Sequence, residues 1–495
     1  MNLEEYTARD GTELHRLMAA REVDPEEVRE AALRAIGAVE TRVNAVVAGP
    51  FADAPGAADG PLAGVPFAVK DTLPEAGRPL GFGTRLSDGY LARRDATLAE
   101  RFRAAGLVSL ARTATPEFAF NIDTAPVVHG PTLNPWDLER SPGGSSGGAA
   151  ALVASGALPM AHGNDGGGSI RVPAAWCGLV GLKPSRGRVP VGPAVGEAVG
   201  GFAHEFAVTR TVRDGAALLD AIHGPAAGDR YYVARASESF TSALGRELPP
   251  LRVAVHTTSF FGAGTDPEAR AAVERTAATL AELGHHVEEA CPALAPDALR
   301  DCLEVVWSVD LAGLAATLTR ITGQEAGPGA VEAASWACVR RGGEISALQL
   351  EASASFVNST SRRWGRFLDE WDLFLCPTTP TAAPASGIPD QDDHRIQTAE
   401  AWISEVFALS PFTPIANLTG QPAISLPLGE SQAGMPLGVM LMAQTLREDL
   451  LFNVASVLET SSPWSHRRPP VHASSPGDDP SRPAGPGITP GAGPS

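Results

Sequence analysis

Lysine is nearly absent from this chain. Its 495 residues include only two lysines, Lys70 and Lys183, among 39 lysines and arginines in total. An arginine guanidinium stays protonated at any working pH, whereas a buried lysine ammonium can lose its proton. A lysine kept in an arginine background therefore predicts a site where arginine cannot substitute. Lys70 ends the apolar run at 64–69, where a cation is costly, and Lys183 is expected to have a structural, paired role.

Cysteines are few and scattered, and the common metal-binding patterns are missing. The five cysteines are odd in number and mostly lie in apolar surroundings, which predicts buried thiols in a reducing cytoplasm. The sequence has no CxxC pair, no HExxH and no Walker sequence, so it signals neither a metal nor an organic cofactor. The cysteines are Cys177, Cys291, Cys302, Cys338 and Cys376.

Positive charge and long apolar runs are also scarce. The formal net charge is −18, and an acidic surface argues against a nucleic-acid partner. No window approaches eighteen uninterrupted apolar residues, so neither a transmembrane helix nor a membrane partner is expected. The acidic start, residues 1–5, lacks the basic-then-apolar pattern of a signal peptide. With 44% hydrophobic and 19% charged residues, the composition is typical of a globular protein with a sizeable core.

Two clusters of glycine and serine stand out against this background. Residues 141–148 read Ser-Pro-Gly-Gly-Ser-Ser-Gly-Gly, and residues 164–171 read Asn-Asp-Gly-Gly-Gly-Ser-Ile-Arg. Glycines let the backbone turn its N–H groups inward and approach a bound ligand closely. One such loop alone can be a linker. Two of them, together with Lys70, indicate a reaction site.

These segments resemble the amidase signature family of serine hydrolases. The match consists of a lysine after an apolar strand, the Gly-Gly-Ser-Ser-Gly-Gly loop, and Asp-x-Gly-Gly-Ser-Ile-Arg. It continues through residues 173–184, with weaker similarity at 211–214, 377–380 and 420–427. The resemblance therefore covers roughly residues 5–465.

The resemblance implies a Ser–Ser–Lys triad and no cofactor. Ser169 matches the nucleophile, Ser145 the bridging serine and Lys70 the base, with a cis peptide bond between Gly144 and Ser145. The chemistry can also be argued from the residues themselves, because a neutral lysine can take the proton of a serine hydroxyl. To act near pH 7, the pKa of Lys70 must fall by about three units, which is roughly 4 kcal/mol and within the range of desolvation.

The glycines before Ser169 predict an oxyanion hole. Attack by Ser169 turns an amide carbonyl into an oxyanion, which backbone N–H groups can stabilise. Asp165 and Arg171 are expected to support this loop by pairing. Ser146 keeps two open roles, either a hydrogen bond to the oxyanion loop or substrate, or a cap for the helix beginning at Gly147. The predicted donors are the N–H groups of Gly166, Gly167, Gly168 and Ser169.

Three positions depart from the commoner family wording. Ala114 lacks the side chain of the usual Asn, which puts local loop bonding in doubt, and Met440 stands where many members carry Gln. Gly166 replaces a usually larger residue and is expected to loosen the oxyanion loop. None of these changes removes a triad residue.

Alternating strands and helices predict an α/β architecture. Residues 251–255 are predicted to form a strand and 266–283 a helix. The resemblance implies one large mixed, twisted sheet sandwiched between helices. We expect one domain over 1–468. Its helical region 290–365 would select the substrate, with Trp307 and Trp336 as candidate pocket walls. The Pro- and Gly-rich segment 469–495 is predicted to be disordered.

The expected function is hydrolysis of a carboxylic amide bond in a small molecule, linear or cyclic, through an acyl-serine intermediate. Segments 162–165, 203–205 and 284–287 are similar to the nylon-oligomer (6-aminohexanoate cyclic dimer) hydrolase branch of the family. Two alternatives stay open, namely an amidotransferase-type subunit acting with partner proteins, and an α/β-hydrolase-like esterase using Ser145. The second needs a strand directly before residue 143. A homodimer is also left open.

Overall fold

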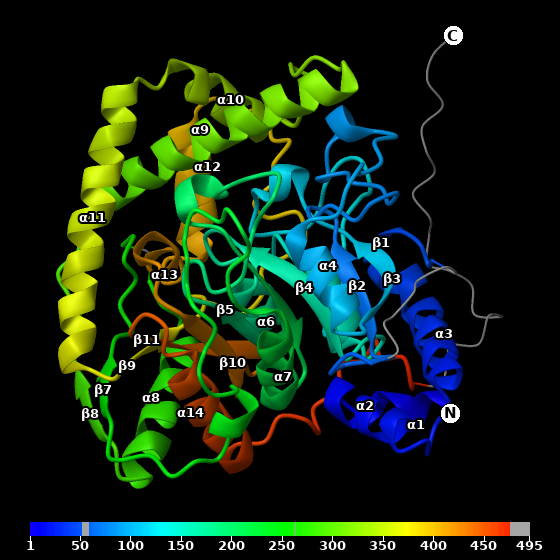
Figure 1. Cartoon of the computed structure of the whole chain (residues 1–495). Coiled ribbons are helices and arrows are strands. Elements are labelled where there is room, and N and C mark those ends of the chain that lie inside the picture. The colour runs from blue at the N-terminus through cyan, green and yellow to red at the C-terminus, as the bar shows by residue number, and fades with distance from the viewer. Residues whose placement is uncertain (52–58, 263, 476–495) are drawn as a thin grey trace.

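An eight-stranded mixed sheet forms the centre of the fold, in the order β4-β6-β5-β10-β11-β9-β7-β8 (Figure 1). The computed structural model describes residues 1–51, 59–262 and 264–475. β7 runs parallel to β8 and β9, and the other pairs are antiparallel. β9 and β11 are buried along their whole length, as expected for strands covered on both faces. The strands are β4 Met160–Asp165, β5 Val180–Lys183, β6 His204–Thr209, β7 Arg252–Val255, β8 His286–Glu289, β9 Leu373–Pro377, β10 Ala423–Glu430 and β11 Pro436–Ala443.

A second, three-stranded sheet carries Lys70. It contains β1 (Val46–Ala48), β3 (Val108–Thr113) and β2 (Pro66–Lys70) in that order, with β2 parallel to β3. All five residues of β2 are buried, and Lys70 is the last of them. β2 also packs beside β4 of the large sheet, so the end of β2 lies next to the second glycine cluster.

Helices cover both sheets, which confirms the predicted α/β architecture with a mixed sheet between helices (Figure 1). Asp24 caps α3 with a complete capping box, and Pro25 occupies its first turn. All eight residues of α5 are buried, because this helix is apolar on every side. The helices are α1 Leu3–Thr7, α2 Gly11–Ala19, α3 Pro25–Val43, α4 Thr97–Ala104, α5 Gly147–Ala154, α6 Arg171–Cys177, α7 Val212–Ile222, α8 Pro267–Glu282, α9 Pro296–Thr322, α10 Ala333–Glu344, α11 Ala347–Glu370, α12 Ala399–Leu409, α13 Pro414–Thr419 and α14 Glu448–Ser461.

The region 290–365 is helical, as predicted. α9, α10 and most of α11 fall within it and form a layer beside the large sheet (Figure 1). By length and composition alone α9 could cross a membrane, but half of its apolar window is buried inside the protein. Leu303, Trp307 and Leu311 of this helix pack into a hydrophobic cluster with residues of α12 and α13. The helix therefore contributes to the core of this layer.

The prediction of disorder from residue 469 onward is wrong for the first part of that segment. Val471 and Ala473 are each 2% exposed. The Val471 N–H donates to the Pro135 carbonyl at 3.1 Å, and the Ala473 N–H to the Ser155 carbonyl at 2.8 Å. Two apolar side chains and two backbone hydrogen bonds hold the segment against the domain despite its composition. Residues 476–495 lie outside the described residues.

Candidate active site

Lys70 lies at the end of β2 with its side chain fully buried. Its Nζ lies 2.6 Å from Asn164 Oδ1, 2.7 Å from Ser145 Oγ and 3.1 Å from Ser146 Oγ. Burial lowers the pKa of Lys70 to about 7, against the smaller opposing effects of the carboxylates of Glu205 and Asp165. A large fraction of the amine is therefore neutral near pH 7, as a general base requires.

The three neighbours of Lys70 orient its lone pair. The Asn164 Oδ1 atom can only accept, because the amide nitrogen of Asn164 donates to Thr72 Oγ1 at 3.1 Å. The Ser146 hydroxyl donates to the Asn164 carbonyl at 3.4 Å, so its oxygen is also free to accept from Lys70. A neutral amine has two N–H groups and one lone pair. When the N–H groups bond Asn164 and Ser146, the lone pair faces the Ser145 hydroxyl.

This geometry decides between the two roles left open for Ser146. Ser146 stands at the N-cap position of α5, but its side chain makes no capping hydrogen bond. Its hydroxyl contacts Lys70 instead, which neither predicted role had included. Its backbone N–H donates to the Ser169 carbonyl at 3.3 Å and so ties the first glycine loop to the second.

The loop that carries Ser145 has the cis peptide bond that the resemblance implies, between Gly144 and Ser145. A Cβ atom on Gly144 would lie 2.6 Å from the Asn121 carbonyl oxygen and 2.7 Å from that of Asp123, so only glycine fits there. Ser145 is 1% exposed, and its hydroxyl contacts Lys70. In the described structure no hydrogen bond joins the hydroxyls of Ser145 and Ser169. The partly exposed Ser169 lines a cavity instead.

The oxyanion loop is organised by Asp165. Asp165 Oδ1 accepts the Gly168 N–H at 2.8 Å, and Oδ2 accepts the N–H groups of Ile170 and Arg171 at 3.2 and 3.3 Å. The prediction that Gly168 donates to an oxyanion is therefore wrong for this geometry, because its N–H is already bonded. Among the described residues, the N–H groups of Gly166, Gly167 and Ser169 have no hydrogen-bond acceptor and can still serve as donors.

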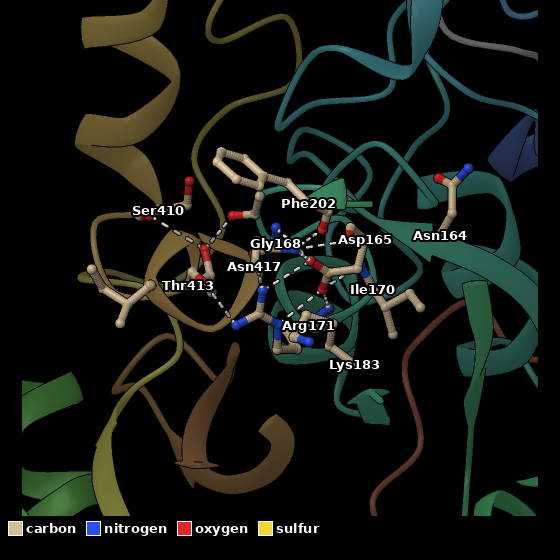
Figure 2. Close-up of polar contacts among 12 residues, drawn as sticks. Asn164, Asp165, Gly168, Ile170, Arg171, Lys183, Phe202, Ser410, Thr413 and Asn417 are labelled. Atoms are coloured by element: carbon tan, nitrogen blue, oxygen red, sulfur yellow. Dashed lines mark hydrogen bonds and ion pairs between the residues drawn. The ribbon is translucent and has the colours of Figure 1, made fainter. Parts of the chain in front are cut away.

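Asp165 and Arg171 form the predicted pair, and both side chains are fully buried (Figure 2). Arg171 Nε lies 2.9 Å from Oδ2 and Nη2 2.8 Å from Oδ1 of Asp165, while Asn417 Nδ2 donates to Oδ1 at 2.9 Å. Burial opposes the charged form, but Arg171 and the Asn417 amide hold the pKa of Asp165 well below its usual range. Asn164 points away from this network, toward Lys70 (Figure 2).

The departures from the common family wording have direct structural consequences. Met440 Sδ lies 3.3 Å from Arg171 Nη1, so a thioether stands against the guanidinium at this position. A Cβ atom on Gly166 would lie 3.0 Å from the Trp307 ring. The expectation of a loosened loop at Gly166 is therefore wrong, because the indole fills the space beside it. Ala114 keeps its loop bonded through its backbone, which contacts Ala45 and Gly148.

A cavity of about 290 Å³ opens beside Ser169. Trp307 of α9 forms part of its wall and stacks on Phe120 at 4.2 Å between ring centroids, as one of the two predicted pocket walls. Trp336 is half-buried and does not line this cavity, so the second prediction is wrong. The other lining residues are Ala119, Asn121, Ile122, Gly144, Gly167, Gly168, Val172, Val406, Phe407 and Ser410.

The sequence reasoning missed the polar residues around Lys70. His162 and Asn164 are two residues apart on β4 and so share the strand face directed toward β2. Asn164 bonds the Lys70 side chain and His162 its backbone. Their alternation within a buried strand was the available signal. Among the described residues, no group of three or more His, Cys, Asp or Glu side chains is arranged to hold a metal ion.

Comparison with known proteins agrees with this geometry. The Amidase family profile matches residues 28–452. The 6-aminohexanoate-cyclic-dimer hydrolase of Paenarthrobacter ureafaciens is 38% identical over 475 residues, covering 93% of this chain and 96% of that protein. A solved structure of 6-aminohexanoate cyclic dimer hydrolase in complex with substrate superposes with a TM-score of 0.88 at 36% identity, covering 94% of this chain and 99% of the other. A bacterial aryl acylamidase of the amidase signature family gives a TM-score of 0.84 at 27% identity, with coverages of 94% and 99%.

Proposed function

The chain belongs to the amidase family, whose members hydrolyse amide C–N bonds, and we propose that it acts through an acyl intermediate on Ser169 with Lys70 as the base. The observation that carries this proposal is the buried Lys70 amine. Its hydrogen-bond donors are occupied by Asn164 and Ser146, and its lone pair faces Ser145.

In the first step, Lys70 takes the proton of Ser145 while Ser145 takes the proton of Ser169. This transfer requires the Ser169 hydroxyl to turn from the cavity toward Ser145. The Ser169 oxygen then forms a bond to the carbonyl carbon of the amide, and the carbonyl π electrons move onto oxygen. A positioned general base of this kind contributes about 10²–10⁴-fold in rate.

The oxyanion is stabilised by the N–H groups of Gly166, Gly167 and Ser169. Each such donor is worth about 3 kcal/mol in the transition state. Collapse of the tetrahedral intermediate breaks the C–N bond, and the leaving amine takes the proton held by Lys70 through Ser145. A water molecule then attacks the acyl group by the reverse proton route, which releases the carboxylic acid and restores Ser169.

For the substrate, we propose a small amide whose carbonyl is flanked by methylene groups, linear or cyclic. Phe120, Trp307 and Phe407 give the cavity beside Ser169 a largely apolar wall. The Paenarthrobacter relative is named for the cyclic dimer of 6-aminohexanoate, in which five methylenes separate the amides. Apolar walls favour this class over amides of charged acids.

We also propose a cytoplasmic location. All five cysteines are free thiols, and four of them are buried. A reducing compartment keeps such thiols free, whereas oxidising compartments favour disulfides.

The esterase alternative with Ser145 as nucleophile is not favoured. A nucleophile elbow requires a strand directly before the serine, and no strand lies between β3 and β4, residues 114–159. The amidotransferase alternative has no specific observation in its favour.

Reaction with a fluorophosphonate, followed by peptide mapping, tests the proposal. We expect one adduct, on Ser169, which is lost in Ser169→Ala and in Lys70→Met, together with hydrolysis of 6-aminohexanoate cyclic dimer or an aryl acylamide by the parent protein. An adduct on Ser145 would restore the esterase alternative. No adduct and no hydrolysis by the folded protein would contradict the proposal.

A further inference from the structure

His162 holds the backbone of Lys70. The Lys70 N–H donates to His162 Nδ1 at 3.2 Å, so this ring nitrogen carries no hydrogen. The proton of the neutral ring is therefore on Nε2, which donates to Glu205 Oε2 at 2.8 Å. Glu205 thereby fixes the tautomer of His162, and His162 fixes the end of β2 where Lys70 stands.

The Glu205 carboxylate sits in an unusual position for a buried acid. Its side chain is 12% exposed, and it borders a hollow of about 440 Å³ that is separate from the cavity at Ser169. In the described residues no Arg or Lys pairs with it, and its hydrogen-bond partner is the neutral His162 ring. The charge of Glu205 is therefore not cancelled by a neighbouring cation.

The other charged groups near Lys70 are paired or held by hydrogen bonds. On β3, Arg112 binds Asp71 and Glu75. On β4, Asp165 is neutralised by Arg171.

The remaining neighbouring elements add little charge. The apolar helix α5 carries no titratable side chain. α3 directs an apolar face inward, while its Glu40 accepts the N–H groups of Ala45 and Val46. On β6, the buried ring of His204 lies beside Glu205. Of all these groups, Glu205 is the largest electrostatic contributor to the ammonium form of Lys70, followed by Asp165.

We propose that Glu205, acting through His162, is a positioning residue that fixes Lys70 against Ser145 and sets the pH at which the amine becomes a base. The proposal deepens the proposed function, since it rests on Lys70 being the base. The uncancelled carboxylate stabilises the Lys70 ammonium and so limits the effect of burial. Without it the amine would lose its proton at a lower pH and would be a weaker base.

The scarcity of lysine makes a direct test possible. Protein labelled with ¹³C at lysine Cε gives two resonances, from Lys70 and Lys183, which Lys183→Met assigns. We expect Glu205→Gln, which keeps the hydrogen bond to His162 but removes the charge, to move the Lys70 titration to lower pH by about 0.5 to 1 unit. Glu205→Ala, which also removes the charge, should move it in the same direction.

Two variants serve as controls. Glu205→Asp keeps the charge and should titrate close to the parent. Glu197→Gln removes a carboxylate from the wall of the same hollow, but one already bound by Arg230 at 2.6 Å and by the Tyr231 hydroxyl at 2.7 Å, so Lys70 should titrate as in the parent.

A second readout follows the reaction itself. The rate of fluorophosphonate labelling of Ser169, measured against pH, should have its acid limb shifted in Glu205→Gln. At a pH well below the limb, this variant should therefore label about 3- to 10-fold faster than the parent. On the plateau it should be slower, because the base is weaker.

The outcomes separate the two proposals. If Lys70 titrates within about 0.2 unit of the parent in both Glu205→Gln and Glu205→Ala, the role of Glu205 is wrong. The lysine resonances need no substrate, so this result stands whether or not the protein labels at Ser169. Failure of the proposed function would be seen in the parent, as a missing Ser169 adduct.

Discussion

The two lysines of this chain occupy two buried regions with opposite surroundings. Lys70 and Lys183 are both 0% exposed, and burial lowers the pKa of each, to about 7 for Lys70 and well below the ordinary value for Lys183. Lys70 Nζ faces two serine hydroxyls and an amide oxygen. Lys183 Nζ donates to the Pro184 carbonyl at 2.7 Å, close to the Asp165–Arg171 pair. Burial alone therefore does not make a base, since a lone pair must also face a proton to remove.

The largest expected effect comes from replacing each lysine by methionine. Lys70→Met should lower amide hydrolysis by about 10³–10⁴-fold, because no other base faces Ser145. Lys183→Met should stay within about fivefold of the parent, since it removes one buried hydrogen bond away from the reacting atoms. Steady-state hydrolysis of an aryl acylamide, with melting curves to verify folding, measures both. Equal losses in the two variants would contradict the contrast between the two regions.

The second prediction concerns the network beside Lys183. Asp165→Asn leaves Arg171 as an unpaired buried cation and weakens the acceptor for the Gly168, Ile170 and Arg171 N–H groups. Breaking a buried pair in this way costs about 3–5 kcal/mol, and we expect a loss of that size in the free energy of unfolding in urea. Asp393→Asn is the matched control, because Asp393 pairs with an exposed Arg395. Its unfolding free energy should change by less than about 1 kcal/mol.

The pH dependence of activity sharpens the comparison further. Lys70 must be neutral to act, and its pKa is about 7. Below this value the neutral fraction falls tenfold per pH unit, so kcat/KM should fall with the same slope and become flat above about pH 8. Lys183 contributes no limb near neutral pH, because its pKa is lowered well below the ordinary value and it does not face a serine. A rate independent of pH between 5 and 8 would show that another group is the base.

The sequence was sufficient to predict the parts of the site that consist of short motifs. Lys70, the two glycine loops and the Asp165–Arg171 pair all lie within contiguous segments, and the structure brings these segments together. The contacts it missed join distant strands. His162 and Glu205 meet only because β4 pairs with β6, and Trp307 reaches Gly166 from a helix about 140 residues later. Register between strands and packing between layers are not encoded in local patterns. The segment 471–473 failed for the same reason, since its partners Pro135 and Ser155 are far away in the sequence.

The smallest expected effect lies at the cavity wall, where Gly166 and Trp307 share one space. Gly166→Ala places a methyl group 3.0 Å from the indole, which is held on its other face by Phe120 at 4.2 Å between ring centroids. Because the stacked ring has little freedom to move, the methyl group should tilt the oxyanion loop, and kcat should fall by about 3- to 10-fold. Trp307→Phe alone should mainly raise KM, because the cavity becomes wider. In the double variant the smaller ring makes room for the methyl group, so kcat should recover relative to Gly166→Ala. Additive losses in the double variant would mean that Trp307 does not set the position of the oxyanion loop.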